Sequence, residues 1–143
     1  MRVYIAYKYK AVQDKELLKD ELQQISDALQ RKGHVPFLLG RDIHKWHLLP
    51  HSSSKPTLVT AFHIVFNIFK SDVIFAYISS EVQSHGLSFE MFCAKLLNKP
   101  VIAATKVGLV LDPSIPGPIT AISFSDVHDL STQIDGLKQD LTK

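Results

Sequence analysis

One glutamate, Glu90, lies where its side chain could do chemistry. It follows Ser84 and Gly86 in the pattern Ser-x-Gly-x-x-x-Glu. With residues 87–97 placed on a helix at about 100° per residue, one apolar face collects Leu87, Met91, Cys93, Ala94 and Leu97, and Glu90 points from the middle of that face. A carboxylate that faces a core needs a partner, a pocket or a raised pKa, because desolvating a charge costs free energy.

The position of Glu90 along its helix adds a second observation. It lies in the first turn, just after the Ser84-x-Gly86 segment, where backbone N–H groups without helical partners can hold an anion. A carboxylate beside an anion-binding loop is typical of an active site. The alternative is a first-turn glutamate that turns to solvent and only favours the helix dipole.

Strands and helices alternate along the chain. Predicted strands cover residues 3–7, 34–39, 72–78, 100–104 and 121–124, and predicted helices cover residues 14–32, 57–70, 87–97 and 126–141. Residues 40–56 and 106–118 are predicted loops. This order predicts an α/β fold, a flavodoxin-like (Rossmann-like) doubly wound parallel sheet of about five strands with helices on both faces. We expect residues 1–143 to form a single domain.

Three details refine these elements. Pro36 suggests an edge position for the second strand, and Asp126 is a suitable N-cap for the last helix. The helix over residues 57–70 is predicted to be amphipathic. Its apolar face would contain Leu58, Val59, Phe62, Val65, Phe66 and Phe69, and its polar stripe would contain Thr60, His63, Asn67 and Lys70.

The predicted topology places the Glu90 motif where ligands bind. In open parallel sheets, ligands occupy the crevice beyond the carboxyl ends of the strands. Three segments follow the carboxyl ends of predicted strands, namely residues 7–13, 40–56 and 79–87. The segment from Ser84 to Glu90 overlaps the last of these. Topology and local chemistry therefore indicate the same functional region.

The composition is ordinary for a soluble protein. Hydrophobic residues make up 45% of the chain and charged residues 21%, and the net charge of +2 is too small to indicate duplex nucleic acid as a partner. No apolar run approaches the roughly 20 residues of a membrane span. Cys93 is the only cysteine and is interpreted as a small core residue rather than a nucleophile. We expect a cytoplasmic protein that needs no cofactor and binds neither nucleic acid nor membrane.

Three histidines in the loop after the second strand raise the question of a metal site. His44, His47 and His51 would share one face of a helix. Only Asp42 lies nearby to complete a ligand set, so we expect no metal. A lid over a pocket, anchored by Trp46, is the interpretation that we favour for residues 40–56.

The chain resembles the nucleoside 2-deoxyribosyltransferase superfamily, which includes the 2′-deoxynucleoside 5′-monophosphate N-glycosidases. The resemblance rests on three pieces of sequence, and the matching order of elements extends it over most of residues 1–125. These pieces are Val3-Tyr4-Ile5-Ala6, Ser71-Asp72-Val73-Ile74-Phe75-Ala76, and Ser84-x-Gly86-x-x-x-Glu90-x-x-x-Ala94 followed by Asn98-Lys99-Pro100-Val101-Ile102.

The resemblance implies a chemistry for this chain. Glu90 would be the nucleophile that attacks the anomeric carbon of the sugar and displaces the base. The serine at position 84 resembles the nucleotide hydrolase branch of the family, which also has serine at the matching position. In that branch the serine helps to hold the 5′-phosphate. Lys8 and Lys10 would supply positive charge to that phosphate. Gly86 would lie against the ligand, and His85 beside it would face either the ligand or solvent. The family also often pairs its subunits, which implies a homodimer.

The chain departs from the family pattern at two places. Tyr7 and its neighbours follow the first strand where the family usually has glycine; the Tyr7 ring would either stack on a base or simply close the strand. The family carries an acid on the helix before the third strand, and the matching position here is Ile64. His63 beside it would replace that acid or face solvent.

These observations support one principal prediction and two alternatives. The principal prediction is an N-glycosidase or deoxyribosyltransferase-like enzyme that cleaves the N-glycosidic bond of a nucleoside or deoxynucleoside 5′-monophosphate through Glu90, with a small-molecule nucleotide or nucleoside as its ligand. The first alternative is a non-catalytic nucleotide-binding or sensing domain of the same fold. The second is a protein-interaction domain in which Glu90 is only a helix-start residue.

Overall fold

The computed structural model describes residues 1–9, 14–43, 45–46, 58–81, 84–110, 115 and 117–142. Its elements follow the predicted alternation. In chain order they are β1 (Arg2–Tyr7), α1 (Lys15–Arg31), β2 (Val35–Phe37), α2 (Leu39–Asp42), α3 (Leu58–Lys70), β3 (Val73–Ile78), α4 (His85–Leu96), β4 (Val101–Lys106), β5 (Thr120–Phe124) and α5 (Val127–Asp135).

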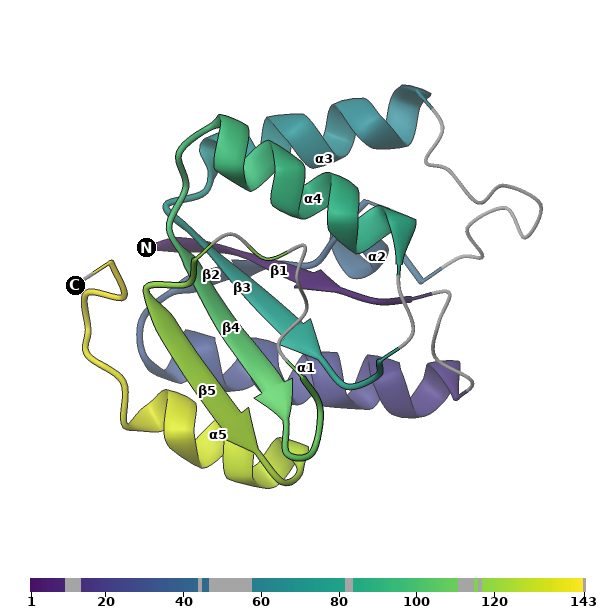
Figure 1. The fold of residues 1–143 in the computed structure, drawn as a ribbon. Helices are drawn as coiled ribbons and strands as arrows, with labels where there is room; N and C mark the ends of the chain where they lie inside the picture. Colours follow the sequence, from purple (N-terminus) through teal and green to yellow (C-terminus); the bar gives the residue numbers. More distant parts are fainter. Residues whose placement is uncertain are drawn as a thin grey trace.

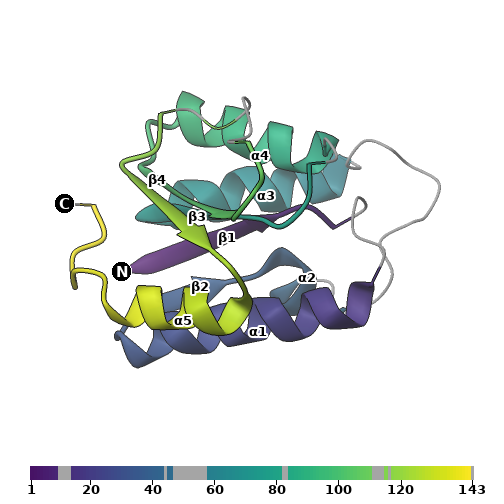
Figure 2. The same cartoon turned by 60° about the horizontal axis from the view of Figure 1, so that its bottom comes forward.

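The five strands form one parallel sheet in the order β2-β1-β3-β4-β5. Helices α1 and α5 cover one face of the sheet, and α3 and α4 cover the other (Figures 1 and 2). This flavodoxin-like, doubly wound arrangement confirms the predicted fold class. The edge position suggested by Pro36 is also confirmed, because β2 pairs only with β1.

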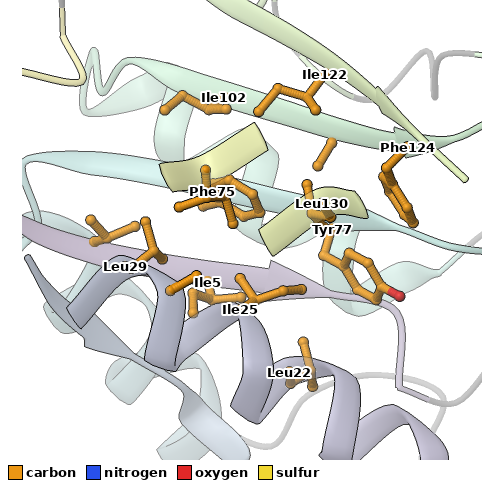
Figure 3. Close-up of a cluster of buried hydrophobic side chains, with 14 of the residues drawn as sticks. Ile5, Leu22, Ile25, Leu29, Phe75, Tyr77, Ile102, Ile122, Phe124 and Leu130 are labelled. Carbon is orange, nitrogen blue, oxygen red and sulfur yellow. The ribbon is translucent and has the colours of Figure 1, made fainter. Parts of the chain in front are cut away.

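Each face of the sheet has its own core. Side chains of α1 and α5, such as Leu22 and Leu130, pack against Ile5 and Phe75 on one face (Figure 3). Residues with the opposite parity along the strands, such as Tyr4 and Ile74, pack beneath α3 and α4. Alternate residues of β1 therefore serve two different cores, and the face to which a β1 side chain belongs decides whether it can reach α4.

Aspartate side chains cap the starts of α1 and α5. The side chains of Asp14 and Asp126 accept hydrogen bonds from Leu17 N and Asp129 N at the starts of α1 and α5. The N-cap role predicted for Asp126 is thus confirmed. The last helix is shorter than the predicted range of 126–141, because α5 ends at Asp135 and Gly136 caps it.

Helix α3 forms where predicted, but its apolar face is turned outward. The six residues of that face are exposed, and the helix instead buries Ile64, Asn67 and Ile68 against the sheet. Asn67 belongs to the predicted polar stripe and is buried because its amide is satisfied: Arg2 Nη2 donates to Oδ1 at 2.8 Å, and Nδ2 donates to the His63 carbonyl at 2.8 Å. The periodic pattern identified the helix but not the side that contacts the sheet.

Strand β3 is buried along its whole length, as its continuous apolar run predicts. Ser71 and Asp72 precede it, and Asp72 Oδ2 accepts a hydrogen bond from Arg2 N at 2.7 Å. None of the helices in the described ranges is long and apolar enough to cross a membrane.

Candidate active site

Helix α4 holds Glu90 through a cap and a packed face. Ser84 is the N-cap, and its Oγ accepts a hydrogen bond from Leu87 N at 3.3 Å. Leu87, Met91 and Ala94 are buried against the sheet, which fixes the rotation of the helix. Because Glu90 shares their side of the helix, its carboxyl group is directed inward, as the sequence pattern predicts.

The two oxygens of the Glu90 carboxyl group have different surroundings. The residue is only 6% exposed. Its Oε1 accepts a hydrogen bond of 2.8 Å from the Tyr4 hydroxyl. Its Oε2 is buried and has no hydrogen-bond partner in the described part of the chain. A buried polar atom without a partner is unusual in a native protein and marks this oxygen for a functional explanation.

Burial changes the protonation of Glu90. Desolvation raises the pKa of Glu90 to about 8, while the hydrogen bond from Tyr4 acts in the opposite direction and lowers it. The pKa of Tyr4 is raised well above its ordinary value by burial first and by the nearby Glu90 charge second. Tyr4 therefore keeps its proton and remains a donor to Glu90. A carboxyl group with a pKa near neutrality can change its charge during a reaction cycle.

Tyr4 is a site residue that the sequence interpretation missed. It stands in the middle of β1 and is completely buried, so its sequence context predicts only a core aromatic residue. Two signals were available: a buried tyrosine hydroxyl needs a hydrogen-bond partner, and Tyr4 has the same strand parity as Ala6 and Lys8. That parity directs all three toward the α3 and α4 side of the sheet.

Lys8 directly follows the carboxyl end of β1. Its side chain is 3% exposed, and Nζ donates a hydrogen bond of 2.9 Å to the carbonyl oxygen of Ser80, just beyond the end of β3. The ammonium group is therefore held where β1 and β3 end, at the edge of the sheet where ligands bind in this topology.

Tyr7 has the opposite strand parity, and its ring packs against the core under α1. The Tyr7 hydroxyl accepts a hydrogen bond from Gly40 N at 3.1 Å. Burial, followed by the charge of Glu90, raises the pKa of Tyr7. The charge of Glu90 thus affects the pKa of Tyr7, but Tyr4 is the tyrosine that donates a hydrogen bond to Glu90. Stacking of Tyr7 on a base stays a prediction.

His85 and Gly86 form the first turn of α4. His85 is exposed, and Gly86 is half-buried. Among the residues that the structure describes, a methyl group built on Gly86 would meet only Ser84 Oγ, at 3.8 Å. The fold itself therefore does not require glycine here, which leaves room beside the helix N-terminus for a ligand.

The candidate acid on α3 is His63. Within the described residues, no hydrogen bond joins its side chain to Glu90 or Tyr4. His63 is half-buried, and its ring lies edge-on to Phe62 with a centroid distance of 6.1 Å. Ile64, at the position where the resembled family has its acid, is buried at 2% exposure. The role of His63 as a proton donor stays a prediction.

Several predicted residues lie outside the described ranges, namely Lys10, His44, His47 and His51. Trp46 is described. Its backbone N–H donates to the Gly40 carbonyl at 2.6 Å, and the Lys19 ammonium lies 5.8 Å from its ring centroid. Cys93 is buried as predicted, and burial raises the pKa of its thiol.

Comparison with known proteins gives a fold but no sequence family. No family model matches the chain, and no curated protein matches it by sequence. Among solved structures, the CMP N-glycosidase BcmB of Clostridium botulinum superposes with a TM-score of 0.65, covering 94% of this chain and 98% of that one, at 16% identity. The chain has the fold of this enzyme.

Two further structures show the same likeness. A 2-deoxyribosyltransferase from Bacillus psychrosaccharolyticus has a TM-score of 0.62 at 18% identity and covers 92% of this chain and 90% of its own. A conserved protein from Enterococcus faecalis V583 has a TM-score of 0.60 at 15% identity, with 95% and 98% covered. The resemblance to deoxyribosyltransferases and N-glycosidases is thus confirmed as a likeness of fold over nearly the whole chain.

Proposed function

We propose that the protein cleaves the N-glycosidic bond of a nucleoside or deoxynucleoside 5′-monophosphate, with Glu90 as the nucleophile. The observation that carries this proposal is the asymmetry of the Glu90 carboxyl group. Tyr4 holds Oε1, while the buried Oε2 lacks a partner in the described residues. One oxygen is therefore oriented by the fold, and the other is left for a ligand.

The proposed reaction uses the ionised form of Glu90. Oε2 attacks the anomeric carbon, the bond from that carbon to the base nitrogen breaks, and its electron pair leaves with the base, which takes up a proton. Water then attacks the anomeric carbon of the glycosyl-enzyme ester and releases Glu90; a second base in place of water gives transfer. Tyr4 keeps the attacking group in one orientation throughout.

The proposed ligand is a nucleotide because a cationic side chain lies just past the carboxyl end of β1, and backbone N–H groups lie at the start of the helix that carries Glu90. Lys8 brings a buried ammonium group to the carboxyl ends of β1 and β3. Ser84 and Gly86 lie at the N-terminus of α4, where backbone N–H groups favour an anion. These groups suit a 5′-phosphate.

Access to Glu90 requires some rearrangement. Glu90 Oε2 has almost no contact with solvent in this conformation. A sugar can reach it only after the side chains that cover it have moved. We therefore expect binding to open the site, and the positive charge that develops on the sugar as the base leaves would be stabilised by the Glu90 carboxylate.

A second candidate function is a nucleotide-binding domain without catalysis. The specific observation in its favour is Ile64, a buried apolar residue at the position where the resembled family has an acid. No acidic residue occurs anywhere in α3. Without a proton donor, departure of the base would be slow even with Glu90 in place.

One experiment separates the two functions. Release of free base is measured from a panel of deoxynucleoside and ribonucleoside 5′-monophosphates and the matching nucleosides, and binding of each is measured by calorimetry. Base release from the monophosphates that exceeds release from the nucleosides supports the proposed enzyme. Binding without release from any member supports the second function. Compared with the wild type, the Lys8→Met variant should bind the monophosphates more weakly and bind the nucleosides with unchanged affinity.

The homodimer and the cytoplasmic location stay predictions, as does the single domain over residues 1–143. None of them enters the chemistry proposed for Glu90, so the base-release experiment does not depend on them.

A further inference from the structure

The proposed reaction needs a proton that Glu90 does not supply. When the bond to the base breaks, its electron pair leaves with the base, and a positioned general acid typically accelerates such a step by about 10²–10⁴-fold. Glu90 reacts as a carboxylate and has no proton to give at that moment. Another group must therefore hold a proton within reach of the base. This inference rests on the proposed function, because it concerns the same reaction.

Two donor side chains in the β1 region already have acceptors within the protein. The Tyr4 hydroxyl donates to Glu90 Oε1 at 2.8 Å. Lys8 Nζ donates to the Ser80 carbonyl oxygen at 2.9 Å. Helix α3 contains no aspartate or glutamate that could take the role of an acid. The donor for the base therefore has to be found among other groups.

The Tyr7 hydroxyl differs from these donors, because its oxygen is engaged and its proton is not. Gly40 N donates to Tyr7 Oη at 3.1 Å, so the oxygen is the acceptor in this bond. No residue that the structure describes accepts the Tyr7 proton in return. The side chain is only half-buried, which leaves it open to a ligand. Since a phenolic hydroxyl can accept and donate at the same time, Tyr7 can give its proton to a ligand while Gly40 still holds its oxygen.

Tyr7 stands where a ligand is expected in this fold. It is the last residue of β1, and its Cα partner across the sheet is Tyr77 of β3. The strand order reverses between β1 and β3, and ligands bind beyond the carboxyl ends of the strands at such a point. The segment that provides Gly40 joins the two cores, because Leu38 packs in the core under α1 and Leu39 in the core beneath α3 and α4. Gly40 thus holds the Tyr7 hydroxyl where the two faces of the sheet meet.

The charge of Glu90 acts on Tyr7. Burial is the largest cause that raises the pKa of Tyr7, the Glu90 charge is the second, and the hydrogen bond from Gly40 N lowers it. The raised pKa keeps the Tyr7 proton in place at the pH where Glu90, with a pKa of about 8, is ionised. When Glu90 becomes an ester, its charge and the repulsion it causes disappear. Tyr7 therefore becomes more acidic as the base leaves, and the Gly40 N–H stabilises the phenolate that forms.

We propose that Tyr7 is the general acid that protonates the leaving base. Its O–H bond breaks, the proton goes to a nitrogen of the base, and the electron pair of the O–H bond stays on the Tyr7 oxygen beside Gly40 N. In the second step, water attacks the anomeric carbon and gives a proton to the Tyr7 oxygen. The bond to Glu90 then breaks, and its electron pair returns to the carboxylate. Both residues are restored, and the sum of the two steps is hydrolysis.

Single-turnover release of base tests this role, because it reports only the first step. The substrate is the purine or cytosine monophosphate that the wild type cleaves fastest. Tyr7→Phe should lose at least about 10²-fold in this rate and bind the nucleotide in calorimetry with unchanged affinity. Tyr77→Phe is the matched control, because it removes a hydroxyl from the neighbouring strand that donates to Glu21 Oε2. Tyr77→Phe should keep the wild-type rate.

A methylated substrate separates an acid from a residue that only supports the fold. The same nucleotide, methylated on a ring nitrogen that is not bonded to the sugar, carries a positively charged base. That base leaves as a neutral molecule and needs no proton, so Tyr7→Phe should release it at close to the wild-type rate. An equal loss on both substrates would overturn the proposal. A rate for Tyr7→Phe within about threefold of the wild type on the unmethylated nucleotide would overturn it as well.

Two further outcomes separate this inference from the function on which it rests. A loss confined to the unmethylated substrate in His63→Gln, and absent from Tyr7→Phe, would assign the acid to His63 and overturn the role of Tyr7. No release of base by the wild type from any nucleotide would contradict the proposed function itself. Release by the wild type together with full activity of Tyr7→Phe would contradict only the role proposed for Tyr7.

Discussion

The Tyr4 hydroxyl lies 2.8 Å from Glu90 Oε1, although 86 residues separate the two in the sequence. Both side chains are buried, and the bond joins the middle of β1 to the inner side of α4. It orients a carboxyl group whose other oxygen has no partner in the described residues. This pair is the structural basis of the proposed chemistry, and the predictions below test its parts.

The first prediction concerns the pH dependence of base release. If Glu90 reacts as a carboxylate, kcat/KM should rise about tenfold per pH unit below its pKa of about 8 in the free protein. Tyr4→Phe removes the hydrogen bond that lowers this pKa, so the inflection should move to higher pH. The variant should also lose about 10- to 100-fold in kcat, the value of one hydrogen bond to a charged group. An unchanged inflection in Tyr4→Phe would show that another group controls the profile.

The second prediction concerns stability as a function of pH. The pKa of Glu90 is raised from 4.5 in the unfolded chain to about 8 in the folded one. A raised pKa means that the contribution of the acid to stability is complete below pH 4.5 and is lost as the pH rises through 8. Between these values, the free energy of unfolding of the wild type should fall relative to Glu90→Gln by several kcal/mol, on the order of 4.

Urea unfolding of both proteins from pH 4.5 to 8.5 provides the measurement. Glu16→Gln is the matched control, because the Glu16 side chain is 83% exposed and its removal should leave the slope of the wild type unchanged. Parallel curves for the wild type and Glu90→Gln would mean that Glu90 keeps an ordinary pKa in the folded state.

The third prediction separates binding from folding at the start of α4. Gly86→Ala should leave the melting temperature equal or slightly raised, because the methyl group meets only Ser84 Oγ at 3.8 Å and alanine favours a helix. If the phosphate approaches the backbone there, KM for the nucleotide should rise about tenfold, a loss of about 1.4 kcal/mol. Ser88→Ala, an exposed change on the same helix, is the control for an effect on the helix alone. An unchanged KM would show that the phosphate does not bind against the backbone at Gly86.

The fourth prediction concerns the glycine that supports Tyr7. A methyl group at Gly40 would lie 2.5 Å from the Tyr7 hydroxyl and 2.8 Å from Trp46 Cζ3. Gly40→Ala should therefore lower the free energy of unfolding by about 1–3 kcal/mol, the usual cost of overpacking. Gly117→Ala is a natural control, because a methyl group there meets no atom of the described residues within 4 Å. Chemical denaturation of the two variants measures the difference; equal stabilities would mean that Trp46 can move away without cost.

The sequence predicted the fold and the inward direction of Glu90 because both depend on strong local patterns. The continuous apolar run of β3 and the alternation of strands and helices left few topologies to consider. The inward position of Glu90 followed from the spacing of Leu87, Met91 and Ala94. No comparable pattern identified Tyr4, because its role depends on a partner on another element, and a tyrosine in a strand is ordinary.

The orientation of α3 could not be predicted from its pattern for a related reason. Apolar residues lie on two sides of this helix, with Ile64 and Ile68 on one side and Phe62 and Phe69 on the other. A periodicity argument selects the larger set, and the sheet buries the smaller one. The buried side includes Asn67, whose amide oxygen accepts from Arg2, and local spacing does not reveal this contact between residues 65 positions apart.

The most direct test of the central claim is base release by Glu90→Gln under single-turnover conditions. The substitution keeps the size of the side chain and an oxygen that can accept from Tyr4, but it removes the nucleophilic carboxylate. The account predicts release by the wild type and by the Glu16→Gln control, and a loss of at least about 10³-fold in Glu90→Gln, with nucleotide binding retained. Release by Glu90→Gln at the wild-type rate would contradict the claim that Glu90 is the nucleophile.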